Sequence, residues 1–292
     1  MKCKFGWIGV FLIYTLVAYG QRPVSNMYMF DFIQQTDDYY EFSHPRFLTG
    51  FNNNGYNNQP YFISNKVLYF ASSRRNATQV DIYALNIQQK TKTQITRTPT
   101  DEYAPNLLPN RQFLSCINVD GTDHRLWKIP IDRSNSGTFL FPQETYIGYH
   151  LWMDDEHVAL SIGDRPTSLG IGNMSDGTVK YITSNVGRCF QVLPDGRLVY
   201  IQKLGQSTWY IKALNINTGR SEILIESKNG QEDFIILTDG TIIQGSGDKL
   251  YKFNPKLDKS WKVMANLGEY GVKNIKRLAW NGNRKLVVVD EM

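Results

Sequence analysis

The sequence is poor in cysteine and lacks the short motifs that identify common enzymes. It contains three cysteines, Cys3, Cys116 and Cys189. The last two fall in non-adjacent repeats of the chain, so we expect two buried thiols rather than a disulfide. No G-x-S-x-G segment marks a serine hydrolase. The segment "GSGDK" (245–249) is a hairpin glycine cluster, because a phosphate-binding loop needs a longer spacing and a following helix.

A hydrophobic run long enough to cross a membrane is also missing. The apolar stretch from Ile8 to Ala18 has eleven residues, whereas a spanning helix needs about 20. Lys2 and Lys4 precede this run, and Ala18-Tyr19-Gly20 supplies small residues where a signal peptidase cleaves. We therefore predict a cleavable signal peptide over residues 1–20 and an exported protein, periplasmic or extracellular. Cys3 lies before the run, which argues against a lipid anchor.

No strong excess of one charge is present. Residues 1–20 contain two lysines and no acid, so their removal lowers the formal net charge from +5 to +3. This small excess is spread along the chain and does not form the basic face of a nucleic-acid-binding protein. Nucleic acid is therefore not an expected partner. The hydrophobic share of 41% is ordinary for a globular chain and predicts a folded core.

What the chain does contain is a repeat. Short β-type runs recur 40 to 46 residues apart, and most are preceded by turn residues such as Asp195-Gly196 and Asp239-Gly240; these runs are "VLYFAS" (67–72), "FLSCINV" (113–119), "VALSIG" (158–163), "LVYIQK" (198–203), "TIIQGS" (241–246) and "KLVVVDE" (285–291). An apolar run precedes each turn, and two further strand-like runs follow. Four strands in each period of 40 to 45 residues are the pattern of a propeller blade.

Five complete units lie between Gln59 and Ile275, and the end of the chain supplies only two strands of another. The missing two match "MYMFDFI" (27–33) and "YYEFSHPRFLTG" (39–50) near the beginning. The sequence therefore predicts an all-β fold, a six-bladed β-propeller in one domain over residues 21–292. Its last blade combines N-terminal and C-terminal strands, which pairs edges that would otherwise stay open.

The first strand of each blade lines the central channel, so its first residues gather at the channel mouth. These residues are Asn57-Asn58-Gln59, Asp101-Glu102-Tyr103, Tyr149-His150, Gly187-Arg188, Gln231-Glu232-Asp233 and Lys276-Arg277. We expect Glu102 to face His150, Arg188 and Glu232 or Asp233. Arg75 and Arg165, in neighbouring loops of the same face, are expected rim contacts for an anionic or protein partner. The candidate binding residues are Glu102, Tyr149, His150, Arg188, Glu232, Asp233, Arg75 and Arg165.

Two interpretations of this polar ring stay open. Propellers fill their channels with water and opposed charges, so the ring has a purely structural explanation. Alternatively, a concave pocket with a few converging polar groups is the usual form of a binding site. Removing the charges distinguishes the two, because it harms stability in one case and binding in the other.

Several segments resemble the repeats of TolB-like six-bladed propellers, a family of bacterial envelope proteins. They include "YFASSRRNATQVDIYALNI", "QITRTPTDEYAPNLLPNRQFLSCINVDGTDHRLWKIPID" and "VGRCFQVLPDGRLVYIQK", and the resemblance covers nearly all of residues 21–292. It implies a periplasmic propeller that acts as a binding or scaffold module for an envelope protein or small ligand. It specifies the fold and leaves the activity open.

An enzyme remains the alternative interpretation. Some six-bladed propellers are calcium-dependent hydrolases, and Asn58, Glu102, Glu232 and Asp233 provide the oxygen ligands that calcium prefers. His150 and Arg188 would bring competing donors into the same opening. Zinc is not expected, because His150 and His157 lack the spacing of a ligand pair. A hydrolase or lyase would use Glu102, His150 and Arg188, with Glu102 and His150 as the acid and base.

The sequence therefore predicts a non-catalytic, monomeric binding protein that needs no cofactor. A protein or a small ligand would bind at the channel mouth.

Overall fold

The computed structural model describes residues 22–163, 165–228 and 230–292. The signal peptide predicted over residues 1–20 lies outside these ranges. In the described chain, all regular structure is β-strand except two short 3₁₀-helices, η1 (Gly50–Asn52) and η2 (Gly268–Tyr270).

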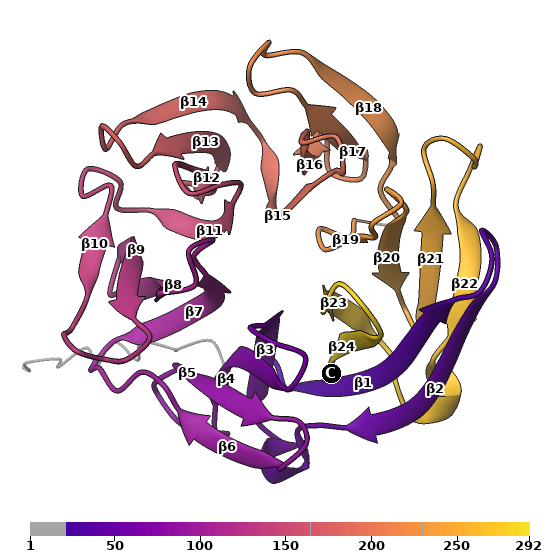
Figure 1. Ribbon diagram of the computed structural model, residues 1–292, viewed down its shortest axis with the longest axis horizontal. Coiled ribbons are helices and arrows are strands. Elements are labelled where there is room, and N and C mark those ends of the chain that lie inside the picture. Colours follow the sequence, from indigo (N-terminus) through magenta and orange to yellow (C-terminus); the bar gives the residue numbers. More distant parts are fainter. Residues whose placement is uncertain (1–21, 164, 229) are drawn as a thin grey trace, which may run out of the picture.

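The strands form six antiparallel four-stranded sheets around a central axis, as predicted, and Figure 1 looks down that axis. Blade 1 contains β3 (Tyr56–Phe62), β4 (Val67–Ser73), β5 (Asp81–Asn86) and β6 (Thr91–Gln94). Blade 2 contains β7 (Asp101–Leu107), β8 (Phe113–Asp120), β9 (Asp123–Pro130) and β10 (Thr138–Leu140). Blade 3 contains β11 (Ile147–Trp152), β12 (His157–Ile162), β13 (Ser168–Asn173) and β14 (Val179–Ser184).

The remaining blades follow the same order, from the axis to the rim. Blade 4 contains β15 (Val186–Val192), β16 (Leu198–Lys203), β17 (Trp209–Leu214) and β18 (Ser221–Glu226). Blade 5 contains β19 (Ile235–Ile236), β20 (Ile242–Ser246), β21 (Lys249–Phe253) and β22 (Lys262–Asn266). Blade 6 contains β23 (Ile275–Trp280), β24 (Lys285–Glu291), β1 (Ser25–Gln34) and β2 (Tyr40–Phe47).

The turn residues explain why the inner strands pair locally. Gly196 and Gly240 follow aspartates in the tight turns before β16 and β20, and both adopt positive φ values, +85° and +89°. Glycine takes this conformation without the steric cost that a Cβ atom brings. The predicted hairpins are therefore confirmed at these two positions.

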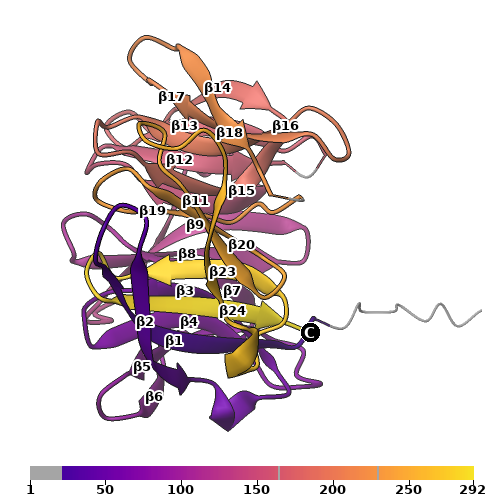
Figure 2. The same cartoon turned by 90° about the vertical axis from the view of Figure 1, so that its right-hand side faces the viewer.

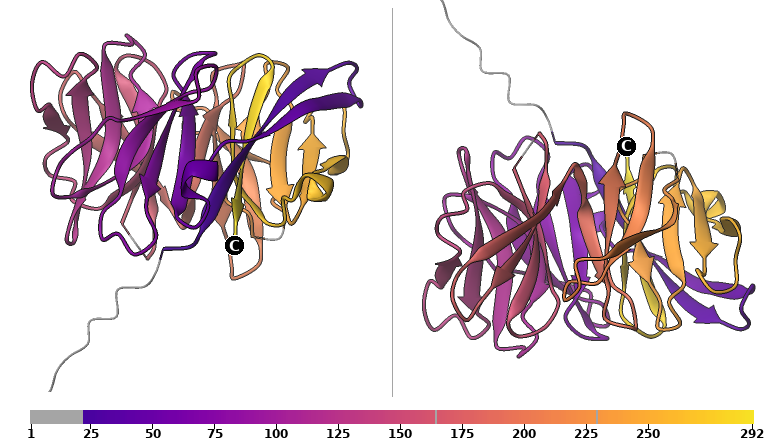
Figure 3. Two further views of the ribbon diagram at one scale, coloured as in Figure 1. Left: turned by 90° about the horizontal axis from the view of Figure 1, so that it is seen from below. Right: turned by 90° about the horizontal axis from the view of Figure 1, so that it is seen from above.

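Both ends of the chain close the ring, as predicted. β1 pairs with β24 from Ser25 opposite Glu291 to Asp31 opposite Lys285. Beyond this ladder, the backbone N–H of Met292 donates to the carbonyl of Val24 at 2.9 Å. The side view shows a disc with the C-terminus at one face (Figure 2), and β1 begins at that same face (Figure 3).

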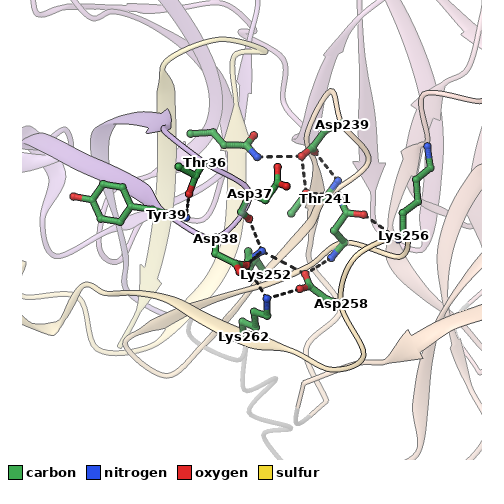
Figure 4. Close-up of polar contacts among 12 residues, drawn as sticks. Thr36, Asp37, Asp38, Tyr39, Asp239, Thr241, Lys252, Lys256, Asp258 and Lys262 are labelled. Carbon is green, nitrogen blue, oxygen red and sulfur yellow. Dashed lines mark hydrogen bonds and ion pairs between the residues drawn. The ribbon is translucent and has the colours of Figure 1, made fainter.

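A cluster of charged residues fixes the β1–β2 turn against blade 5 (Figure 4). Lys252, only 2% exposed, places its Nζ 2.6 Å from Asp38 Oδ1 and 3.4 Å from Asp258 Oδ2. Lys262 Nζ lies 2.7 Å from Asp38 Oδ1 and 2.8 Å from Asp258 Oδ1. Hydrogen bonds from the two lysines lower the pKa of Asp38 to about 2. We call these four residues the latch, because they join the N-terminal hairpin to blade 5.

The apolar core lies between neighbouring blades. Phe30 and Phe32 of β1 are buried with Ile235, Ile243 and Leu250 of blade 5. Burying such a side chain contributes roughly 1.5 to 3 kcal/mol. Cys116 and Cys189 are both buried and free, which confirms the expectation of two thiols.

Candidate functional site

The segments from which sites were proposed meet one face of the ring. The first strand of each blade begins there, and the connections between second and third strands lie beside those beginnings. We call this the mouth face, and it is the face that carries the C-terminus (Figure 3).

A cleft of about 700 Å³ is open on the mouth face around blades 3 and 4. Its volume falls within the range of roughly 300 to 1,000 Å³ that is usual for small-molecule sites. Its described lining residues are His124, Tyr146, Gly148, Ser161, Gly163, Arg165, Pro166, Thr167, Asn185, Val186, Arg188, Lys203 and Glu232.

Glu232 organises the charged wall of this cleft. One carboxylate oxygen accepts the backbone N–H of Arg188 at 2.9 Å, and the other forms an ion pair with Lys203. Burial alone would raise the pKa of Glu232, but Lys203 and the Arg188 N–H hold that pKa below its ordinary value. Lys203 also lies 4.4 Å from the centre of the Trp209 ring. Glu232 is therefore ionised at neutral pH, and Lys203 is held in place on two sides.

The Arg188 side chain has more freedom than its backbone. Its Nε lies 3.7 Å from Glu232 Oε2, beyond a good hydrogen bond, and 63% of the side chain is exposed. Arg165, in the connection between β12 and β13, is also exposed and lines the cleft. Two guanidinium groups therefore border one cleft.

The floor of the cleft is small and polar. Ser161 is fully buried, and among the described residues its hydroxyl has no hydrogen-bond partner. Gly148 lies between Ser161 and Arg188, because a Cβ added there would be 3.3 Å from Ser161 Oγ and 3.9 Å from Arg188 Cδ. A methyl group at position 148 would therefore press against the Ser161 hydroxyl.

Glu102 is placed away from this cleft. Its carboxylate is fully buried. One oxygen accepts hydrogen bonds from Thr98, Thr100 at 3.0 Å and Asn118 at 3.1 Å. Among the described residues, no donor reaches the other oxygen. Burial raises the pKa of Glu102, against the effect of the threonine hydroxyls. Neither His150 nor Arg188 is among its partners, so the expected meeting of these three side chains is not observed.

His150 is buried between blades 2 and 3. Its Nε2 lies 2.7 Å from Ser115 Oγ, which also accepts the indole N–H of Trp152 at 2.9 Å. Burial lowers the pKa of His150 to about 3. The imidazole is therefore neutral near pH 7, and it is fully shielded from solvent.

Asp233 and Tyr149 meet around Arg277 in a second polar group. Arg277 Nη1 lies 3.2 Å from Asp233 Oδ2, and its guanidinium is 5.6 Å from the centre of the Tyr149 ring. Burial raises the pKa of Asp233 to about 6, although Arg277 opposes this shift. Neither Asp233 nor Tyr149 lines the cleft.

Arg75 stands apart from both groups. It is exposed in the connection between β4 and β5 of blade 1 and does not line the cleft. Of the eight candidates, the cleft brings together Arg165, Arg188 and Glu232.

Sequence reasoning missed Lys203, Ser161, Gly148 and Tyr146. Lys203 ends the run "LVYIQK", and Ser161 lies near the end of "VALSIG". Both runs are second strands, and second strands end at the mouth face. If the last residues of the second strands had been considered together with the first residues of the first strands, Lys203 and Ser161 would have been among the candidates.

The calcium interpretation is not supported by the donor set. Among the described residues, no three His, Cys, Asp or Glu side chains gather closely enough to hold one metal ion. Of the oxygen donors proposed for calcium, Glu232 is bound to Lys203 and Asp233 to Arg277.

Within the described residues, no helix has the length and apolar character needed to cross a membrane.

Comparison with known proteins identifies the fold. The sequence matches no family model and no curated protein. TolB from Acinetobacter baumannii is similar with a TM-score of 0.57 and 11% identity, covering 91% of this chain and 64% of that chain, just under two thirds of its length. A TolB-like protein from Agrobacterium tumefaciens gives a TM-score of 0.68 at 11% identity, covering 93% of this chain and 99% of that one. A chain of a nidogen/laminin complex gives 0.65 at 10% identity, covering 87% and 97%. The chain thus has the six-bladed propeller fold that TolB structures share.

Proposed function

We propose that this protein is a non-catalytic binding module, exported as a monomer, whose mouth-face cleft receives a small ligand or a segment of a partner protein. The observation that carries the proposal is the cleft of about 700 Å³ in which Arg165, Arg188, Lys203 and Glu232 converge. Predominantly concave sites with a few placed polar groups are typical of ligand binding.

The fold supports the same interpretation at a coarse level. Propellers of this shape occur in TolB structures and in a complex between nidogen and laminin. Likeness at 10 to 11% identity concerns the fold alone, so the argument for binding depends on the cleft itself. Export depends on the sequence of residues 1–20.

The alternative, a hydrolase or lyase using Glu102, His150 and Arg188, has less support. Glu102 and His150 are fully buried with different partners. A general acid or base must reach the reacting atoms, and these two groups do not share an opening.

The test compares wild-type protein with an Arg165→Ala/Arg188→Ala variant. Each protein is immobilised for capture from an envelope extract, and each is tested in solution for thermal shifts with a ligand library. Arg220→Ala is the matched control, because Arg220 is exposed in the β17–β18 turn on the opposite face. We expect a partner or ligand that wild type and the control retain and the double variant loses, while all three melt alike. Equal binding by all three proteins, or none by wild type, would contradict the proposal.

A further inference from the structure

The cleft has a charge pattern that selects one class of ligand. Its described lining residues include three cations, Arg165, Arg188 and Lys203, and one acid, Glu232. Lys203 is already paired with Glu232 and is only 27% exposed. The acid is therefore occupied, while Arg165 and most of the Arg188 side chain are exposed.

A guanidinium group binds a carboxylate through two parallel hydrogen bonds, a geometry that an ammonium group does not match. Glu232 supports this role for Arg188 because it fixes the Arg188 backbone at 2.9 Å and leaves most of the side chain exposed. The anchoring of the backbone reduces the freedom that the site would lose when a ligand binds.

The floor adds a further polar group. The buried hydroxyl of Ser161 has no partner among the described residues, and unsatisfied buried polar groups are rare. Gly148 lies next to both Ser161 and the aliphatic part of the Arg188 side chain, and it has no side chain to fill the space beside them. A compact polar group that moves in against this shielded hydroxyl would give it a hydrogen-bond partner.

The rim is aromatic. Tyr146 lines the cleft with 41% of its surface exposed. Its ring stacks on His124, with centroids 5.1 Å apart and an interplanar angle of 20°. A flat ring held in this way offers an apolar face to a ligand ring.

We infer that the cleft binds a compact ring acid, with its carboxylate on Arg188 and Arg165 and its ring against Tyr146. This inference rests on the proposed function and names its ligand class. Ring carboxylates occur in two sources, acidic sugars and aromatic acids, and both present the same head group.

The test uses NMR titration of the full chain with four probes. D-Glucuronate and 4-hydroxybenzoate are ring acids from the two sources. D-Glucose is the neutral match for glucuronate, and N-acetylglutamate is an acid without a ring. We expect dissociation constants on the order of millimolar for at least one ring acid, and weaker binding for glucose and N-acetylglutamate. Added salt should weaken the ring-acid binding because the contact is ionic.

Three variants locate the binding. Arg188→Ala should weaken ring-acid binding by roughly 10-fold or more, the effect of losing a charged hydrogen-bonded contact. Gly148→Ala should weaken it without changing any charge, since the added methyl narrows the floor. Arg220→Ala, on the opposite face, should leave it unchanged.

The outcomes separate this inference from the proposed function. Binding by one ring acid alone supports the inference and identifies the source. The inference is overturned if glucose binds with the same affinity as glucuronate. It is also overturned if N-acetylglutamate binds with the same affinity as the two ring acids. If no probe binds but Arg165→Ala/Arg188→Ala still loses a captured partner, the inference fails and the binding function stands. If neither occurs, both fail.

Discussion

The backbone N–H of Arg188 donates to Glu232 Oε2 at 2.9 Å, although 44 residues separate the two positions in the chain. Because Lys203 binds the other carboxylate oxygen, Glu232 joins the beginning of β15 to the end of β16 and to its own segment before β19. The charged wall of the cleft is therefore also a structural joint between blades 4 and 5.

We expect Glu232 and Lys203 to be energetically coupled. A double-mutant cycle with Glu232→Gln and Lys203→Met should give a coupling free energy of about 1 kcal/mol, the upper range for partly exposed pairs. Urea unfolding measures it. The matched cycle uses Arg197→Met and Glu222→Gln, because Glu222 is 59% exposed against 24% for Glu232. Equal coupling in the two cycles would contradict the structural role of Glu232.

Ring closure by the two ends of the chain makes a second prediction. Deleting residues 276–292 removes β24 and nearly all of β23, so β1 loses its inner partner from Ser25 to Asp31. Cooperative unfolding should disappear, since β1 and β2 would have no sheet to join. Differential scanning calorimetry tests this. A truncated protein that kept its full thermal transition would show that the closure is dispensable.

The latch should depend far more on Lys252 than on Lys262. Lys252 is 2% exposed and pairs with Asp258, whose side chain is fully buried. Lys252→Ala removes a buried side chain together with its charge, and replacing a buried side chain by alanine costs roughly 2 to 5 kcal/mol. Asp258 keeps Lys262 at 2.8 Å, so we expect a loss near the lower end of this range. Lys262 is 46% exposed, so water screens its ion pairs and Lys262→Ala should cost clearly less than Lys252→Ala.

Chemical denaturation of both latch variants measures the difference. Similar losses of unfolding free energy would mean that the two lysines stabilise the latch equally and that burial of Lys252 does not determine its contribution. A Lys252→Met variant serves as the control for packing, because it keeps the length of the side chain without its charge.

The fold followed from the sequence because its signals are local and repeated. Turn pairs such as Asp195-Gly196 and Asp239-Gly240 mark hairpins wherever they occur. The spacing of these hairpins then limited the architecture to a propeller, and the unmatched runs at the two ends required the shared sixth blade.

The site followed less well because the direction of a side chain is not local. Their equivalent positions in the blades place Glu102 and His150 at the mouth, but both side chains are fully buried. His150 bonds to Ser115 of blade 2, and Glu102 to the Thr98 and Thr100 hydroxyls. Bulges in the inner strands, such as the irregularity between Ile147 and Tyr149, shift these directions. One sequence without structure does not reveal them.

The burial of His150 predicts a pH dependence of stability. Its pKa is about 3 in the folded protein and about 6.5 in an unfolded chain. Between these values the unfolded chain binds a proton that the folded protein excludes, so stability falls as the pH falls from about 6.5 toward 3. The loss attributable to this group is on the order of 5 kcal/mol at most.

Comparing wild type with His150→Phe isolates this effect. Phenylalanine cannot titrate, and Ser115 keeps its hydrogen bond from Trp152. Asp233 has a raised pKa of about 6 in the folded protein. Its protonation therefore increases the stability of the fold as the pH falls below about 6, which is opposite to the effect of His150. This contribution is the same in wild type and in the variant. We expect the unfolding free energy of the variant to decline less steeply with acid. Parallel curves would show that His150 is not the responsible group.

A substitution of Glu102 tests whether the acids of the segment "TDEYAPNLLPN" (100–110) belong to a binding site. Its pKa is raised by burial, so ionisation makes the fold less stable as the pH rises above the ordinary glutamate range. Glu102→Gln removes this cost, and the amide oxygen can still accept hydrogen bonds from Thr98, Thr100 and Asn118. We expect the variant to be no less stable than wild type at pH 7 and to bind every cleft ligand equally well. Thermal melts across pH and the same ligand titrations measure this. If Glu102→Gln instead melted normally but lost binding, the cleft around Arg188 would be the wrong site, and the mouth of blade 2 would replace it.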